Sequence, residues 1–265
     1  MSDNIDFHKC LITRKNHIYL IMGEPESGKS HLVCNLFKQF AAAKVFKRGI
    51  AFTPYDVDED EDSLSFMPKY ACVPYSKEVF INYFNNLLEL KKKIEKKKDP
   101  MTGEKKKMPK NFIIFEDQQG VIKFNDPDIL NLISMFRKPN TSFFFILHQI
   151  SRDFADYLKM ACRYAFIFNY TDKKNIKFLN EAFGAGDFSD GEFMQFVRDN
   201  TDFHEKTCLL LVKNHPIYGR LWVKYKAGEK EKFKFQFKLF PMIKKISNDS
   251  DKEASDIDQK DRNNE

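Results

Sequence analysis

Cysteine and tryptophan are scarce in this sequence. Its 265 residues include five cysteines and one tryptophan. The cysteines are scattered and no two of them form a C-x-x-C pair, which argues against a structural zinc site. An odd number of isolated cysteines also argues against a disulfide framework, and it favours reduced thiols in a cytosolic or nuclear setting.

Long hydrophobic runs are absent as well. The longest apolar stretches, such as FFFIL at 143–147, suit a buried strand and are far shorter than the ~20 residues of a transmembrane helix. The first ten residues, MSDNIDFHKC, lack the apolar centre of a signal peptide. The sequence therefore predicts a soluble, intracellular protein.

Positive charge is concentrated in one segment. The net charge is +6, and residues 91–110 hold ten lysines against Glu95, Asp99 and Glu104, so the rest of the chain is close to neutral. Two interpretations of this segment stay open. It is either a solvated, mobile stretch or a basic loop that contacts nucleic-acid phosphates.

A glycine-rich stretch, MGEPESGKSHL at 22–32, contains the strongest motif. Gly23, Gly28, Lys29 and Ser30 match the phosphate-binding pattern G-x-x-x-x-G-K-[ST], between an apolar segment and a helical one. In such a loop Lys29 reaches the β- and γ-phosphates of ATP and Ser30 ligates Mg²⁺, while backbone N–H groups surround the phosphates. The predicted nucleotide-binding residues are Gly23, Glu24, Pro25, Glu26, Ser27, Gly28, Lys29, Ser30 and His31.

Two acidic residues inside this loop need an explanation. Because the loop binds phosphate through backbone groups, we expect the side chains of Glu24 and Glu26 to face solvent. Replacing both with alanine would then leave the affinity for ATP nearly unaltered.

Paired carboxylates follow a second apolar segment, FIIFED. Glu116 and Asp117 come directly after a predicted strand, where nucleotide hydrolases hold a metal and activate water. The usual order is Asp then Glu, and here it is reversed. By register Glu116 occupies the metal position and Asp117 the water position, but the two roles are not separable from sequence, so both are candidate Mg²⁺ ligands with Ser30.

A further pair of polar residues, His148 and Gln149, follows directly after the apolar strand at 141–147. Some P-loop proteins carry an extra strand between the phosphate loop and the carboxylates, here 49–54. In these proteins the later strand, here 141–147, lies between the first and third strands, and its carboxyl end meets the γ-phosphate at the edge of the sheet. A polar residue there is a candidate sensor of the γ-phosphate. Gln149 is the preferred candidate and His148 the second.

Alternating apolar segments and helical patterns predict an α/β P-loop NTPase with a mostly parallel central sheet, helices on both faces and a C-terminal β-hairpin that extends the sheet. We expect one ATPase domain over 1–246, with 91–110 as a lysine-rich insertion, and a disordered polar tail over 247–265. The expected strands are 17–22, 49–54, 111–117, 141–149, 164–170, 207–213, 220–225 and 232–240, and the expected helices are 29–44, 76–98, 126–138, 151–161, 172–183 and 190–199.

Together the loop, FIIFED, FRKPNTS at 136–142, the strand ending in glutamine and YAFIFN resemble the genome-packaging ATPases of large nucleocytoplasmic DNA viruses, in the FtsK–HerA superfamily. The resemblance covers about Asn16 to Asn180, plus a weaker C-terminal hairpin, and it is greatest to the poxvirus members. It implies a ring, usually of six subunits, that threads double-stranded DNA, together with capsid or capsid-vertex partners and a location in the cytoplasm or viral factory of an infected cell. It also implies that an arginine from a neighbouring subunit completes the site, and Arg137 is the candidate; Arg163 or Arg152 could fill the role of a second family arginine.

The predicted function is therefore an ATP-driven motor that moves viral DNA into a preformed capsid, with ATP and Mg²⁺ as cofactors. Two alternatives remain. A nucleoside or nucleotide kinase uses the same loop, but it needs an arginine-rich lid, and segment 91–110 contains no arginine. A nucleotide-gated virion assembly protein without motor activity is compatible with the reversed carboxylates.

Overall fold

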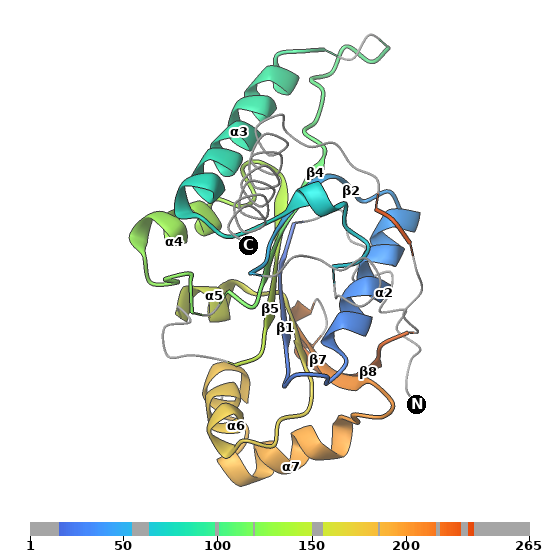
Figure 1. Cartoon of the computed structure of the whole chain (residues 1–265), viewed down its shortest axis with the longest axis vertical. Coiled ribbons are helices and arrows are strands. Elements are labelled where there is room, and N and C mark those ends of the chain that lie inside the picture. The colour runs from blue at the N-terminus through green and yellow to red at the C-terminus, as the bar shows by residue number, and fades with distance from the viewer. Residues whose placement is uncertain are drawn as a thin grey trace, which may run out of the picture.

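Eight strands of the computed structural model form one sheet in the order β3-β2-β4-β5-β1-β6-β7-β8 (Figure 1). The structure describes residues 16–54, 64–98, 101–118, 120–149, 156–184, 186–215, 218–228 and 233–235. The strands are β1 (Ile18–Met22), β2 (Phe46–Phe52), β3 (Cys72–Val73), β4 (Lys110–Glu116), β5 (Thr141–Leu147), β6 (Tyr164–Ile167), β7 (Thr207–His215) and β8 (Gly219–Lys226).

Strands β1 to β6 pair in parallel, whereas β7 and β8 form an antiparallel hairpin that extends the sheet beyond β6. Strand β5 lies between β1 and β4, with Leu20 opposite Phe145 and Phe145 opposite Phe115. Both the strand order and the C-terminal extension confirm the predicted fold class. The carboxyl ends of β1, β5 and β4 consequently meet at one edge of the sheet.

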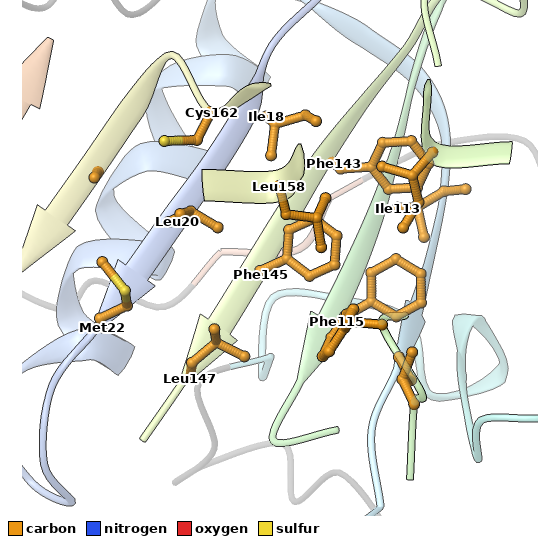
Figure 2. Close-up of a cluster of buried hydrophobic side chains, with 14 of the residues drawn as sticks. Ile18, Leu20, Met22, Ile113, Phe115, Phe143, Phe145, Leu147, Leu158 and Cys162 are labelled. Atoms are coloured by element: carbon orange, nitrogen blue, oxygen red, sulfur yellow. The ribbon is translucent and has the colours of Figure 1, made fainter. Parts of the chain in front are cut away.

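Helices cover both faces of the sheet. Helix α2 (Lys29–Ala42) packs on one face, and α3 (Lys77–Glu95), α4 (Pro127–Ser134) and α5 (Asp156–Ala161) lie on the other (Figure 1). Helices α6 (Lys173–Leu179) and α7 (Asp190–Asn200) bury apolar residues against the same core as α3. Figure 2 shows part of that core, in which alternate residues of β1 and β5, such as Leu20 and Phe145, meet Leu158 of α5.

Several helix ends follow from local sequence. Asp126 caps α4 by accepting from the backbone N–H of Asp128, and Pro127 takes the first helical position, as predicted. A capping box at Ser189 and Glu192 starts α7. None of the helices in the described ranges is long and apolar enough to cross a membrane.

Some boundaries differ from the predicted ones. Strand β2 begins at Phe46, since a bulge accommodates the polar pair Lys47–Arg48 that looks like loop in sequence. The chain leaves α4 at Ser134 and reaches β5 through turns. Described residues 233–235 are not strand, although Phe235 is buried and donates its N–H to the carbonyl of Phe66. The rest of the predicted strand 232–240, Ser151, Arg152 and the predicted tail lie outside the described residues.

Candidate nucleotide-binding site

The glycine-rich loop connects β1 to α2 in a conformation that requires its second glycine. Gly28 has φ 108°, and a Cβ there would lie 3.1 Å from both the Phe168 ring and the side chain of Lys206. Glycine alone among the residues adopts such an angle without strain. Because α2 begins at Lys29, the N–H groups of its first turn are directed toward the carboxyl edge of the sheet.

The loop lysine is buried and all three of its ammonium hydrogens have acceptors. Lys29 Nζ lies 2.8 Å from the carbonyl oxygens of Gly23 and Glu24 and 2.9 Å from Nδ1 of His148. Burial lowers the pKa of Lys29 to about 8, although the carboxylates of Asp117, Glu116 and Glu24 oppose this fall. The lysine therefore stays mainly protonated at neutral pH and loses its charge as the pH rises through 8.

His148 joins the loop lysine to the carboxylate pair. Its Nε2 lies 2.7 Å from Asp117 Oδ2. Since an ammonium group only donates, Nδ1 accepts from Lys29, and Nε2 carries the proton that it donates to Asp117. The hydroxyl of Tyr170 donates to the carbonyl oxygen of His148 at 3.0 Å and anchors the backbone of this residue. A hydrogen-bonded chain thus runs from the loop lysine to the end of β4.

The two carboxylates occupy different positions. Glu116 is the last residue of β4 and is buried, and it shares the α2 face of the sheet with Phe112 and Ile114. Asp117 has left the strand with φ 51°, and its N–H donates to the carbonyl of Ile146. This turn directs the Asp117 side chain along the edge toward His148, whereas Glu116 stays on the side where α2 begins.

The residues present fit a magnesium ion. Asp117 Oδ1 is buried and has no hydrogen-bond partner in the described part of the chain. The described part of the chain contains no group of three or more His, Cys, Asp or Glu side chains that could hold a metal ion by themselves. Mg²⁺ in nucleotide sites needs fewer, because it takes one or two carboxylates together with phosphate oxygens and waters. Ser30, Glu116 and Asp117 could supply such ligands.

The Glu24 side chain is half-buried and hydrogen-bonded to another segment, so the prediction that it simply faces solvent is wrong. Its Oε1 accepts from the backbone N–H of Thr171 at 2.7 Å and from the Thr171 hydroxyl at 2.8 Å, and the N–H of Asp172 lies at 3.4 Å. The carboxylate therefore joins the phosphate loop to the segment that starts α6. Glu26 is exposed, as predicted.

Replacing Glu24 with alanine is expected to lower the free energy of unfolding by about 1–2 kcal/mol, because charge-assisted hydrogen bonds from Thr171 are lost. Glu26→Ala is the matched control and should unfold like the wild-type protein. Urea denaturation of both variants measures the difference. Equal stability of the two variants would show that the Glu24–Thr171 contact contributes nothing.

The other predicted residues lie at different distances from this centre. Ser30 and His31 are in the first turn of α2 and are half-buried, while Gln149 is exposed beyond His148. Arg137 precedes β5, at the opposite edge of the sheet, so the seven residues of β5 separate it from the loop by roughly 20 Å. It does not reach the loop of its own chain.

Sequence reasoning missed the partners that come from distant segments. Thr171 and Tyr170 follow β6, and Lys206 precedes β7 with its side chain against Gly28. Tyr170 and Thr171 could have been predicted as site residues from their position after β6, because β6 lies beside β1 in a parallel sheet and both strands end at the same edge. No local pattern marked Lys206.

Comparison with known proteins shows similarity of fold rather than of sequence. No protein-family model matches the chain, and no curated protein matches its sequence. The genome packaging NTPase B204 of Sulfolobus turreted icosahedral virus 2, in complex with ATP-gammaS, is similar at TM-score 0.52 and 12% identity over 80% of this chain and 97% of that one. B204, the DNA-packaging ATPase of Sulfolobus turreted icosahedral virus, is similar at TM-score 0.57 and 11% identity over 82% of this chain and 100% of that one.

A conjugation coupling protein has a similar fold as well. The pCW3 conjugation coupling protein TcpA, with ATPgS, is similar at TM-score 0.51 and 11% identity over 82% of this chain and 62% of that one. At these identities the comparisons establish architecture. The predicted α/β P-loop NTPase fold is thus confirmed, and the chain shares this architecture with the packaging and coupling proteins above.

Proposed function

We propose that the chain hydrolyses ATP and uses the energy to move double-stranded DNA. The observation that carries this proposal is the hydrogen-bonded chain from Lys29 through His148 to Asp117, at the edge where the phosphate loop and the carboxylate strand meet. A lysine, a sensor and two carboxylates are the groups that phosphate-bond hydrolysis requires around the γ-phosphate. The fold shared with B204 supports the more specific proposal that the DNA is a viral genome entering a capsid.

Each group has a role in this proposal. Lys29 would exchange its hydrogen bonds to the loop carbonyls for bonds to the phosphate oxygens. The Nε2–H of His148 would donate either to Asp117, as in this structure, or to the γ-phosphate. Ser30 and Glu116 would hold Mg²⁺, which neutralises charge on the phosphates when bound. Asp117 would orient and deprotonate the attacking water. Glu24 fixes the loop, and its contact with Thr171 connects nucleotide binding to α6.

The position of Arg137 supports a shared site. A hollow of about 360 Å³ surrounds it at the edge opposite the loop, and among the described residues Glu95 is the only carboxylate that lines it. Its basic lining residues are Lys91, Lys105, Lys106, Lys107, Arg137 and Lys138. If subunits stack head to tail in a ring, this edge of one subunit meets the phosphate loop of the next. Arg137 would then contact the neighbour's nucleotide, while the lysines would contact phosphates of DNA.

His148 and Gln149 are distinguished by their placement. His148→Ala is expected to lower the rate of ATP hydrolysis about 100-fold, because Asp117 and the γ-phosphate lose the group between them. Gln149→Ala, at the adjacent exposed position, should change the rate less than about threefold. Phosphate release measures both. The reverse order of effects would assign the sensor role to Gln149, as the sequence predicted.

Hydrolysis with and without linear duplex DNA tests the proposed function. We expect DNA to stimulate phosphate release and added salt to weaken the stimulation, since contacts to phosphates release counterions. Transfer of the γ-phosphate to a nucleoside would establish a kinase instead. ATP binding without turnover, with or without DNA, would indicate a nucleotide-gated assembly protein.

A further inference from the structure

Three basic residues, here the cationic row, lie side by side across β6, β7 and β8: Arg163, Lys213 and Arg220. Lys213 of β7 lies directly opposite Arg220 of β8. On its other side, the backbone N–H of Lys213 donates at 2.9 Å to the carbonyl of Arg163, the residue before β6, so these two are also opposite partners. Opposite residues of antiparallel strands have side chains on the same face, and like charges there destabilise a sheet. The row therefore calls for a compensating anion.

The cationic row lies at the edge of the sheet opposite the phosphate loop. The N–H of Arg163 donates to the carbonyl of Ile18, the first residue of β1, at 3.0 Å. Figure 2 shows Cys162, the residue before Arg163, near Ile18. The phosphate loop follows Met22 at the other end of β1, so the length of this strand separates the two by roughly 15 Å. An anion at the row is consequently not held by the loop of its own chain.

The guanidinium group of Arg220 is half-buried, and part of it lacks acceptors. Its Nε and Nη2 atoms are buried without a hydrogen-bond partner in the described ranges. The group lies 5.6 Å from the centre of the Trp222 ring. Burial lowers the pKa of Arg220, although the carboxylate of Asp187 and the Cys162 thiol oppose this fall. Buried donors without acceptors cost free energy, which a bound anion would recover.

The ammonium group of Lys213 is positioned but not neutralised. Its Nζ donates to the carbonyl of Lys159 at 2.6 Å and lies 5.2 Å from the centre of the Phe183 ring. An ammonium group has three donors, and the carbonyl accepts from one of them. Among the described residues, neither Lys213 nor Arg220 forms an ion pair with a carboxylate. The fold thus holds both cations in place and leaves their charge uncompensated.

We propose that the cationic row binds a phosphate dianion, either free inorganic phosphate or the terminal phosphate of a small molecule. Guanidinium groups donate pairs of parallel hydrogen bonds to phosphate oxygens, and the ammonium group of Lys213 adds a point charge beside them. At neutral pH such a phosphate carries close to two negative charges, so it offsets more of the row than a single carboxylate does. This site is additional to the phosphate loop and does not depend on the proposed function.

Calorimetry with inorganic phosphate tests the site on full chains that all carry Lys29→Ala, because this change weakens the loop as a competing phosphate site. Adding Arg220→Gln is expected to lower the affinity for phosphate at least about tenfold, since the paired hydrogen bonds and one charge are lost. Lys224→Gln, at an exposed position of the same strand, is the matched control and should stay within about twofold. Glycerol phosphate, titrated in the same way, distinguishes a carried phosphate from a free one.

Thermal denaturation of the same chains separates ligand binding from folding. Arg220→Gln removes one of three repelling charges, so its midpoint without phosphate should not be lower than that of Lys29→Ala alone. Saturating phosphate should raise the midpoint of Lys29→Ala by about 5 °C and change that of the Arg220→Gln chain much less.

Three results would overturn the site. The first is equal phosphate affinity of the Arg220→Gln and Lys224→Gln chains, and the second is a Lys29→Ala chain that binds no phosphate. The third is an Arg220-dependent affinity for duplex DNA or for an acidic peptide without any for phosphate, which would assign the row to a macromolecule. Failure of DNA to stimulate ATP hydrolysis would contradict the proposed function and leave the phosphate site standing.

Discussion

Replacing Lys29 with alanine is expected to lower the rate of ATP hydrolysis at least about 100-fold, because the buried cation of the phosphate-binding loop is removed. Its three hydrogen bonds to Gly23, Glu24 and His148 show that the ammonium group is held at the centre of the site. The affinity for ATP should fall as well. Phosphate release and nucleotide binding, measured on the same preparation, give the two effects separately.

Lys47→Ala provides the control for this variant. Lys47 is an exposed lysine of β2, so its removal changes the net charge equally without touching the loop. It should hydrolyse ATP at the wild-type rate. Turnover by Lys29→Ala equal to that of Lys47→Ala would remove the loop lysine from the mechanism.

Replacing Phe144 with alanine is expected to lower the free energy of unfolding by about 3–5 kcal/mol, the usual cost of deleting a buried aromatic ring. Phe144 of β5 is fully buried, and its ring stacks on Tyr19 with centroids 4.4 Å apart and planes 3° from parallel. It also contacts Phe37 and Phe40 of α2. This cluster seats the helix that follows the phosphate loop, so its loss should also weaken ATP binding.

Phe203→Ala makes the same chemical change at the surface. Phe203 is 42% exposed, and we expect its removal to cost less than about 1 kcal/mol. Thermal and urea denaturation compare the two variants. Similar losses of stability would mean that the aromatic cluster does not carry the packing between α2 and the sheet.

The features that follow from local sequence were predictable. The phosphate loop, the strand before it and the cap at Asp126 each depend on a few neighbouring residues, and the structure has all three. The strand order was also predictable, since an extra strand between the loop and the carboxylates is typical of proteins that insert a later strand beside the first.

The features that depend on distant residues were not predictable. The contact of Glu24 with Thr171 was not predictable, because the two residues are 147 positions apart in sequence. His148 and Gln149 both follow β5, and strand alternation no longer orients side chains once the strand has ended. The placement of His148 is set by Lys29 and Asp117, which contact its ring.

In the proposed function, Glu116 belongs to the hydrolytic machinery beside the loop. Phosphate release from ATP, with Mg²⁺ and duplex DNA present, tests it on wild type and Glu116→Gln, with ATP binding measured in parallel. The amide keeps the size of the side chain and removes its charge, so we predict retained binding and release at least about 100-fold slower. Release at the wild-type rate by Glu116→Gln would show that the Glu116 carboxylate takes no part in hydrolysis.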